Sequence, residues 1–210
     1  MRVSLADQDD RQLNGQLNGQ LSCLAAAVAQ ALQRPHTLAI ALGANLPSQA
    51  GEPADTLLAV RPLLEQAVQD WSGAPTALRF RWSPLQQTAP VGGPAEQNDY
   101  VNGALLVELP CSASPAQPSP AAALQLLQGL QQLESRFGRP PVTEREHWGP
   151  RSLDLDWLWW GHLQLDLPAT AATPALQLPH PLWRQRGFVV EPLAAIAGLG
   201  TTLKLEFSPA

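Results

Sequence analysis

The chain has 210 residues, of which 45% are hydrophobic, 15% are charged and 21 are prolines. A chain of this length favours one domain with a substantial hydrophobic core, and its many prolines predict long loops or a flexible extension. The formal net charge of -5 disfavours nucleic acid as a partner, although locally clustered arginines could still bind a nucleotide.

Residues 1–35 are expected to form an extension of the folded domain, which would span residues 36–210. A polar repeat, in which Gln-Leu-Asn-Gly occurs twice over residues 12–19, cannot build a core. The alanine- and leucine-rich segment Leu21–Gln33 predicts one short helix, which ends before Pro35. The sequence assigns no chemistry to this extension.

The same N-terminal region indicates a cytoplasmic protein without a membrane partner. The apolar stretch Leu21–Leu32 is too short to cross a bilayer, and aspartates rather than basic residues precede it. The two cysteines, Cys23 and Cys111, lack metal-ligand spacing and are typical of free thiols in a reducing compartment.

Alternation and helical spacing of apolar residues predict an α+β domain. Strands are predicted by continuous or alternating apolar residues over Thr37–Leu42, Ala77–Thr88, Val101–Leu109 and Ser152–Trp160. Helices are predicted by apolar spacing over Ala54–Asp70, Ala121–Phe137 and Phe188–Ala197. Proline-containing stretches predict loops over Pro110–Pro120 and Pro168–Pro179. The order of elements indicates a ferredoxin-like split βαβ sandwich, a mostly antiparallel sheet with helices packed on one face.

Two carboxylates on the last long strand carry the densest functional signal. Asp154 and Asp156 alternate with apolar residues, so both side chains point to the same side of the strand. Hard oxygen ligands of this kind suit Mg²⁺, which takes one or two carboxylates together with substrate phosphates. A bare Asp-x-Asp is more often a solvated strand face. Arg151 shifts that balance, because a guanidinium beside the pair can clamp phosphate as well as form a salt bridge.

This strand closely resembles the signature of the hydroxymethyl-dihydropterin pyrophosphokinases. The matching residues are Trp148-Gly149-Pro150-Arg151-Ser152-Leu153-Asp154-Leu155-Asp156. Further matches follow the family's order: Gly43-Ala44-Asn45-Leu46, Thr88-Ala89-Pro90-Val91-Gly92 with Asp99-Tyr100-Val101-Asn102, and Pro179-His180 with Arg186-Gly187-Phe188. The resemblance covers roughly residues 36 to 200, and the aspartate signature is its most specific part.

The resemblance implies ATP as co-substrate, a pterin as acceptor and a role for each matched residue. Asp154 and Asp156 would hold two Mg²⁺ ions that bridge the ATP phosphates. The pterin would stack between Tyr100 and Phe188, although either ring could be ordinary core. Its polar edge would be bound by Thr88, Pro90, Val91 and Asn102. The phosphates and nucleotide would be contacted by Arg139, Trp148, Arg151, His180 and Arg186. The sequence assigns no general base, and we expect a monomer.

The chain departs from the family chiefly in the loop before the signature. Between residues 138 and 147 it carries Arg139 and Arg145 as its only arginines, with His147 where the family usually has arginine. The loop also holds two glutamates and two prolines and is about two residues longer. Such loops close over substrates and set turnover, so ATP affinity and closure are in question. Glu134 on the preceding helix matches an acidic residue near the nucleotide.

Three other readings compete with this one. A catalytically weakened pterin- or nucleotide-binding relative would keep the pocket, and the sparse basic loop supports it. A different nucleotide transferase with the same fold would not need Tyr100, Asn102 and Phe188. A structural α+β interaction domain leaves the acid–arginine cluster without a role, and fold alone does not decide function.

Overall fold

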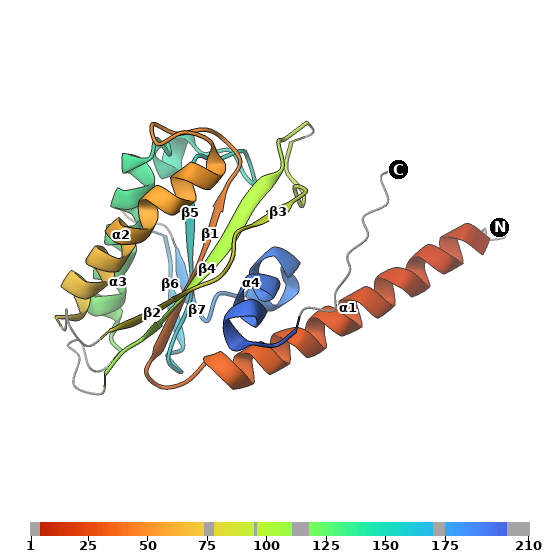
Figure 1. Cartoon of the computed structure of the whole chain (residues 1–210), viewed down its shortest axis with the longest axis horizontal. Coiled ribbons are helices and arrows are strands. Elements are labelled where there is room, and N and C mark those ends of the chain that lie inside the picture. The colour runs from red at the N-terminus through yellow and green to blue at the C-terminus, as the bar shows by residue number, and fades with distance from the viewer. Residues whose placement is uncertain (1–4, 74–77, 95, 111–117, 170–174, 201–210) are drawn as a thin grey trace.

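The computed structural model describes residues 5–73, 78–94, 96–110, 118–169 and 175–200. Within these residues, one antiparallel sheet has the strand order β2-β4-β1-β5, with β3 also paired to β4 (Figure 1). The strands are β1 (Thr37–Ala44), β2 (Arg79–Trp82), β3 (Gln86–Thr88), β4 (Tyr100–Glu108) and β5 (Asp154–Trp160). Helix α2 (Pro53–Ser72) connects β1 to β2, and α3 (Pro120–Arg136) connects β4 to β5. Because β4 lies between β1 and β2, the split βαβ order predicted from the sequence is confirmed.

Where the sequence predicted a single strand over Ala77–Thr88, the described residues form the two strands β2 and β3. Pro84 lies between them and has no N–H to donate to a ladder. The hydroxyl of Ser83 instead accepts a hydrogen bond from the backbone N–H of Ala104, at 2.9 Å. Both short strands therefore pair with β4, but at separate places along it.

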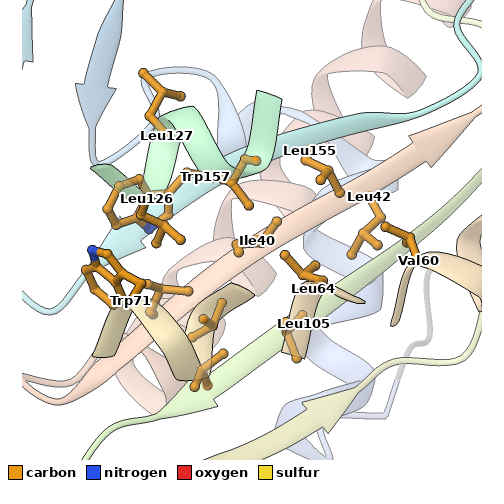
Figure 2. Close-up of a cluster of buried hydrophobic side chains, with 14 of the residues drawn as sticks. Ile40, Leu42, Val60, Leu64, Trp71, Leu105, Leu126, Leu127, Leu155 and Trp157 are labelled. Atoms are coloured by element: carbon orange, nitrogen blue, oxygen red, sulfur yellow. The ribbon is translucent and has the colours of Figure 1, made fainter. Parts of the chain in front are cut away.

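One face of the sheet is covered by α2 and α3. The N-cap of α3 is Ser119, whose hydroxyl accepts the N–H of Ala122, and the C-cap of α2 is Gly73, in the left-handed conformation that favours glycine. Between the two helices and the sheet lies a large apolar core, part of which Figure 2 shows. It includes Ile40, Leu42, Val60, Leu64, Trp71, Leu105, Leu126, Leu127, Leu155 and Trp157. This core fixes which face of β5 is free for chemistry.

The opposite face of the sheet is also covered, so the expectation that helices pack on one face is wrong. Helix α4 (Gly187–Ala197) packs against β4, and α1 (Leu5–Leu32) packs against α4. A second apolar cluster joins these elements to the sheet, and Figure 1 shows the pair on the side away from α2 and α3. The sheet residues in this cluster include three alanines, Ala39, Ala41 and Ala104, beside the larger Leu106, Leu158 and Trp159.

Helix α1 is much longer than the short helix expected over Leu21–Gln33. It has 28 residues and runs through the polar repeat, because that repeat spaces its leucines four residues apart, as one helical face requires. Its C-terminal half buries Ala25, Val28 and Leu32, while Cys23 is an exposed free thiol. Cys111 and most of the Pro110–Pro120 loop lie outside the described residues. The boundary proposed at residue 36 stays a prediction.

The stretch Pro168–Pro179 was expected to be irregular, but its end forms a strand. β7 (Leu176–Leu178) pairs antiparallel with β6 (Leu165–Leu167), and both its leucines are buried. Residues 170–174 lie outside the described part. A 3-10 turn, η2 (Trp183–Gln185), then leads into α4. None of the described helices combines the length and the apolarity that crossing a bilayer requires.

Candidate active site

A cavity of about 370 Å³ lies at one end of the sheet, beside the start of α4. It is lined by most of the residues that the sequence singled out: Thr88, Val91, Tyr100, Asn102, Trp148, Arg151, Asp154, Asp156, Arg186 and Phe188. These residues come from three separate parts of the chain. Pro90, Arg139 and His180, which were predicted with them, do not line the cavity.

Asp154 and Asp156 lie on the cavity side of β5, as alternation predicted. Leu155, between them, is buried in the core under α2 and α3. Across the ladder the two aspartates pair with Gly43 and Ala41 of β1. Because these partners have the smallest side chains, the floor of the cavity leaves space beside both carboxylates. A side chain at position 43 would crowd the amide oxygen of Asn102, since a Cβ there would lie 3.1 Å from it.

The two carboxylates differ in their charged partners. Asp154 pairs with Arg151 at 2.6 Å and also with Arg139, whereas Asp156 pairs with Arg186 at 3.0 Å. Burial alone would raise the pKa of Asp154, but its two arginines hold that pKa below the ordinary value. Burial, followed by the charge of Asp154, raises the pKa of Asp156 to about 6. The pair therefore repels, and a cation placed between the carboxylates would relieve that repulsion.

Glu134 lies behind this pair and is 4% exposed. Its carboxylate accepts the backbone N–H of Leu155 at 2.9 Å and pairs with Arg139 and with Arg145, the latter at 3.2 Å. Burial raises the pKa of Glu134 to about 7, with Arg139 opposing and Asp154 adding to the shift. Glu134 thereby ties the loop that begins at Arg139 to the outer edge of β5, and its place near the nucleotide stays a prediction.

An aromatic ring stands at each side of the cavity, and each is contacted by an arginine. The guanidinium of Arg151 lies 5.9 Å from the centre of the Tyr100 ring, and that of Arg186 lies 5.8 Å from the centre of the Phe188 ring. Tyr100, Arg151 and Asp154 are called the Tyr100 side below, and Phe188, Arg186 and Asp156 the Phe188 side. Both rings are partly exposed in the cavity, which is not typical of ordinary core residues.

Polar loop contacts hold the Tyr100 side, and sequence reasoning missed the residue at their centre. The side chain of Gln97 donates to the backbone oxygens of Gly92, Pro94 and Trp148, and its oxygen accepts from the Tyr100 hydroxyl at 3.2 Å. The Asn45 amide also donates to that oxygen. Such links between distant loops leave no periodic signal, so a single sequence could not reveal this role.

Trp148 closes the cavity from the loop before β5. Its indole is 48% exposed and stacks on the ring of His147, with ring centres 4.7 Å apart. It also lies over Gly92, where a Cβ would come within 2.8 Å of the indole. Trp148 itself has a φ of 54°, an uncommon conformation for a bulky residue. The glycine and the tryptophan therefore form one contact between the two loops.

His180 and the pair Asn102 and Thr88 are the remaining polar groups among the predicted site residues. Burial, followed by the charge of Arg186, lowers the pKa of His180 to about 4. Its Nδ1 accepts the N–H of Leu182 at 3.2 Å, so the neutral ring carries its proton on Nε2 and can donate only from that atom. The amide nitrogen of Asn102 donates to the hydroxyl of Thr88 at 2.8 Å.

The side chains of the cavity suit a metal ion only as a pair of carboxylates. Among the described residues, no group of three or more histidine, cysteine, aspartate or glutamate side chains could hold an ion by itself. The pair Asp154 and Asp156 nevertheless fits Mg²⁺, which commonly takes one or two carboxylates and fills its remaining positions with phosphate and water. Both carboxylates line the cavity beside the small residues Gly43 and Ala41, and this geometry leaves space for a cation next to them.

Comparison with known proteins gives consistent matches. A family model described as 7,8-dihydro-6-hydroxymethylpterin-pyrophosphokinase (HPPK) matches residues 39–198. A 2-amino-4-hydroxy-6-hydroxymethyldihydropteridine pyrophosphokinase of Pseudomonas aeruginosa is 34% identical over 158 residues, covering 75% of this chain and 78% of that protein. The protein of the same name from Haemophilus influenzae is 31% identical over 161 residues, covering 77% and 81%. That from Synechocystis is 42% identical over 101 residues, but only 42% of its length is matched.

Proposed function

Because this chain belongs to the 7,8-dihydro-6-hydroxymethylpterin-pyrophosphokinase family, we propose that it transfers a pyrophosphoryl group from ATP to 6-hydroxymethyl-7,8-dihydropterin in folate biosynthesis. The observation that carries the proposal is one cavity with two aromatic rings and two carboxylates, each ring and each carboxylate contacted by an arginine. A plain phosphate-binding site has no need of the rings, and a plain aromatic pocket has no need of the acids.

The pterin would lie between Tyr100 and Phe188. A flat heteroaromatic ring gains buried area and offset stacking from such a sandwich. Asn102 supplies an amide, which offers both donor and acceptor to the pterin edge, and Thr88, Pro90 and Val91 lie on the segment that would complete this edge. The arginines now facing the two rings would then turn towards the phosphates, which bind a guanidinium more strongly.

The triphosphate would lie along Asp154 and Asp156. These carboxylates would hold Mg²⁺, as two ions, and the metal would supply charge neutralisation between the ATP phosphates. Arg151 and Arg186 would contact the same phosphates, and Arg139, His180 and Trp148 would contact the nucleotide from the surrounding loops. Neutral His180 would donate a hydrogen bond from Nε2 rather than bring a charge.

The reaction is a single displacement at phosphorus. The hydroxyl oxygen of the pterin bonds to the β-phosphorus of ATP, the bond from that phosphorus to the α,β-bridging oxygen breaks, AMP leaves and the hydroxyl proton is released. Positioning and charge stabilisation are the main demands of such transfers. The arginines would supply the latter in a partly buried site, where electrostatic interactions are stronger than in water.

Formation of AMP from ATP and Mg²⁺, with and without 6-hydroxymethyl-7,8-dihydropterin, tests the proposal. We expect AMP to appear only when the pterin is present, together with a pterin diphosphate. ATP cleavage at the same rate with and without the pterin would contradict the proposal that the pterin is the acceptor. Removal of Mg²⁺ with a chelator should abolish turnover. We also propose that the protein is a monomer, which analytical ultracentrifugation would test. We propose a cytoplasmic location, which fractionation of the producing cells would test.

A catalytically weakened binding relative is the second candidate, and one observation favours it. The two arginines of the loop before the signature, Arg139 and Arg145, both pair with Glu134. If both arginines keep this partner when ATP is present, as this second candidate requires, neither would contact the nucleotide. Tight pterin binding without AMP formation would select this candidate over the enzyme.

A further inference from the structure

Helix α1 lies outside the region that the family model matches, residues 39–198. Among the described residues, none of those lining the cavity comes from α1. By position alone it would be an extension without a part in the site. Its contacts lead to a different conclusion.

The C-terminal half of α1 is built into the second apolar cluster. Ala25 is 1% exposed, Val28 0% and Leu32 4%, and all three belong to the cluster that holds η2 and α4 against the sheet. From η2 the cluster takes Trp183, which is 1% exposed and lies against Trp159, with ring centres 5.2 Å apart. Figure 1 shows α1 crossing α4 on the side away from the sheet. Helix α4 is therefore held between the sheet and α1.

The elements that α1 contacts are those that carry the Phe188 side of the cavity. Helix α1 packs against both η2 and α4. Arg186 directly follows η2 and is the N-cap residue of α4, and Phe188 is in the first turn of that helix. Phe188 also packs against the same apolar cluster, and Val189, a buried member of it, lines the cavity. A continuous apolar contact thus runs from Val28 to the ring of Phe188.

We propose that α1 is a brace that positions Phe188 and Arg186 for the pterin and phosphates, with Ala25 and Val28 as positioning residues. The proposal rests on the proposed function. A ring that is already fixed loses less side-chain freedom on binding, so preorganisation raises affinity without any new contact to the ligand. Without the brace, the outer face of α4 loses its apolar cover and the ring loses its fixed position.

A matched pair of substitutions in full-length protein separates this role from general stabilisation. Ala25→Asp places a charge in the buried contact, whereas Ala26→Asp makes the same change at the neighbouring position, which is exposed. Affinity for 6-hydroxymethyl-7,8-dihydropterin would be measured by calorimetry with Mg²⁺ and a non-hydrolysable ATP analogue, well below each melting temperature. We expect Ala25→Asp to weaken binding about three- to tenfold, the range of one aromatic stacking contact, and Ala26→Asp to leave it unchanged.

Combining Ala25→Asp with Phe188→Leu distinguishes an effect of α1 on the Phe188 ring from a general loss of stability. If α1 acts through the ring, adding Ala25→Asp to Phe188→Leu should cost little further affinity, because contacting or coupled sites are not additive. Additive losses, or a lowered melting temperature with unchanged pterin affinity, would overturn the proposal. Should Ala25→Asp prevent folding, Val28→Ala takes its place with a loss of about two- to threefold. A wild-type protein that neither binds the pterin nor forms AMP would instead refute the proposed function, which is the premise.

Discussion

The two sides of the cavity present similar groups but are held in place by different forces. Each side has an aromatic ring, an arginine and an aspartate. On the Tyr100 side these are fixed by hydrogen bonds: the hydroxyl of Tyr100 shares its single proton between Gln97 Oε1 and the backbone oxygen of Gly149, and the latter also accepts from Arg151. On the Phe188 side the ring rests on an apolar cluster that reaches α1.

This difference predicts different sensitivities. Hydrogen bonds between loops depend on single side chains, and their loss leaves polar groups without partners. Apolar contacts are spread over many atoms, so removing one methyl or methylene group removes only part of the contact. The change can still shift a packed side chain elsewhere in the same cluster. Replacing a polar side chain should therefore disturb the Tyr100 side only close to the change. Replacing a buried apolar side chain should disturb the Phe188 side even when that side chain lies in α1.

The largest effect is expected from the aspartates themselves. Asp156→Asn and Asp154→Asn should each lower kcat by at least ~10²-fold, since each removes a carboxylate proposed to hold the Mg²⁺ that would neutralise the reacting phosphates. Their effects on stability should differ. Removing Asp154 leaves Arg139 and Arg151 without their shared partner and should cost about 1–3 kcal/mol. The raised pKa of Asp156 means that its negative charge is disfavoured in the folded protein. Asp156→Asn should therefore lower the free energy of unfolding by less than Asp154→Asn does.

Chemical denaturation of the two variants without ligand, beside steady-state kinetics, measures both quantities. Circular dichroism gives the control that each variant is folded. Equal losses of stability would contradict the unequal charge environment of the two carboxylates, and an unchanged kcat for either would contradict its place in the site.

The next effect concerns the rings. Phe188→Leu should raise the KM for the pterin about tenfold, because it removes one stacking surface while keeping an apolar side chain of similar size. Phe188→Tyr keeps the ring and serves as the control. Initial rates at saturating ATP measure the change, and a KM that is the same for all three proteins would show that the pterin does not stack on this side.

The sequence predicted which residues line the cavity better than it predicted which elements hold them in place. Alternation in β5 was enough to place Asp154 and Asp156 together, because a period of two is a local property of a strand. The helices α2, α3 and α4 were predicted, but the cover on the second face of the sheet was missed, although the continuous apolar run at the start of β1 is typical of a strand buried on both faces. For α1, the polar composition of the repeat concealed the helical spacing of its leucines.

Other features had no local signal. Gln97 acts through hydrogen bonds to a loop some fifty positions away, and nothing in its neighbourhood distinguishes it from the other glutamines. Arg139, which is expected at the nucleotide, also pairs with Glu134 and Asp154, and neither of these ion pairs was predicted. Such arrangements depend on the tertiary structure, which brings together side chains from separate elements.

A smaller effect should follow from Gln97→Met, which keeps the length of the side chain and removes its polar atoms. We expect the KM for the pterin to rise about threefold, because the substitution removes the hydrogen bonds that hold Tyr100, with a net loss of about one hydrogen bond. Tyr100→Phe, which loses the same hydroxyl contact from the other partner, should give a similar change. The double variant should be no worse than either alone. The same replacement at exposed Gln125 controls for the chemistry of the change, and an effect there as large as at Gln97 would refute the local role.

The smallest effect on turnover, and a distinct one on stability, is expected from Glu134, which lies behind the Tyr100 side. Because its pKa is raised from 4.5 to about 7, the folded protein binds this proton more tightly than the unfolded chain does. The contribution of Glu134 to stability is therefore fully present below pH 4.5 and is lost as the pH rises through about 7. Glu134→Gln keeps an oxygen for the N–H of Leu155 but cannot titrate. Between acid and neutral pH, the wild-type protein should lose roughly 1–3 kcal/mol of stability relative to this variant. Urea denaturation across that range measures the difference. A constant gap between the two proteins would mean that the arginines, rather than burial, govern the charge of Glu134.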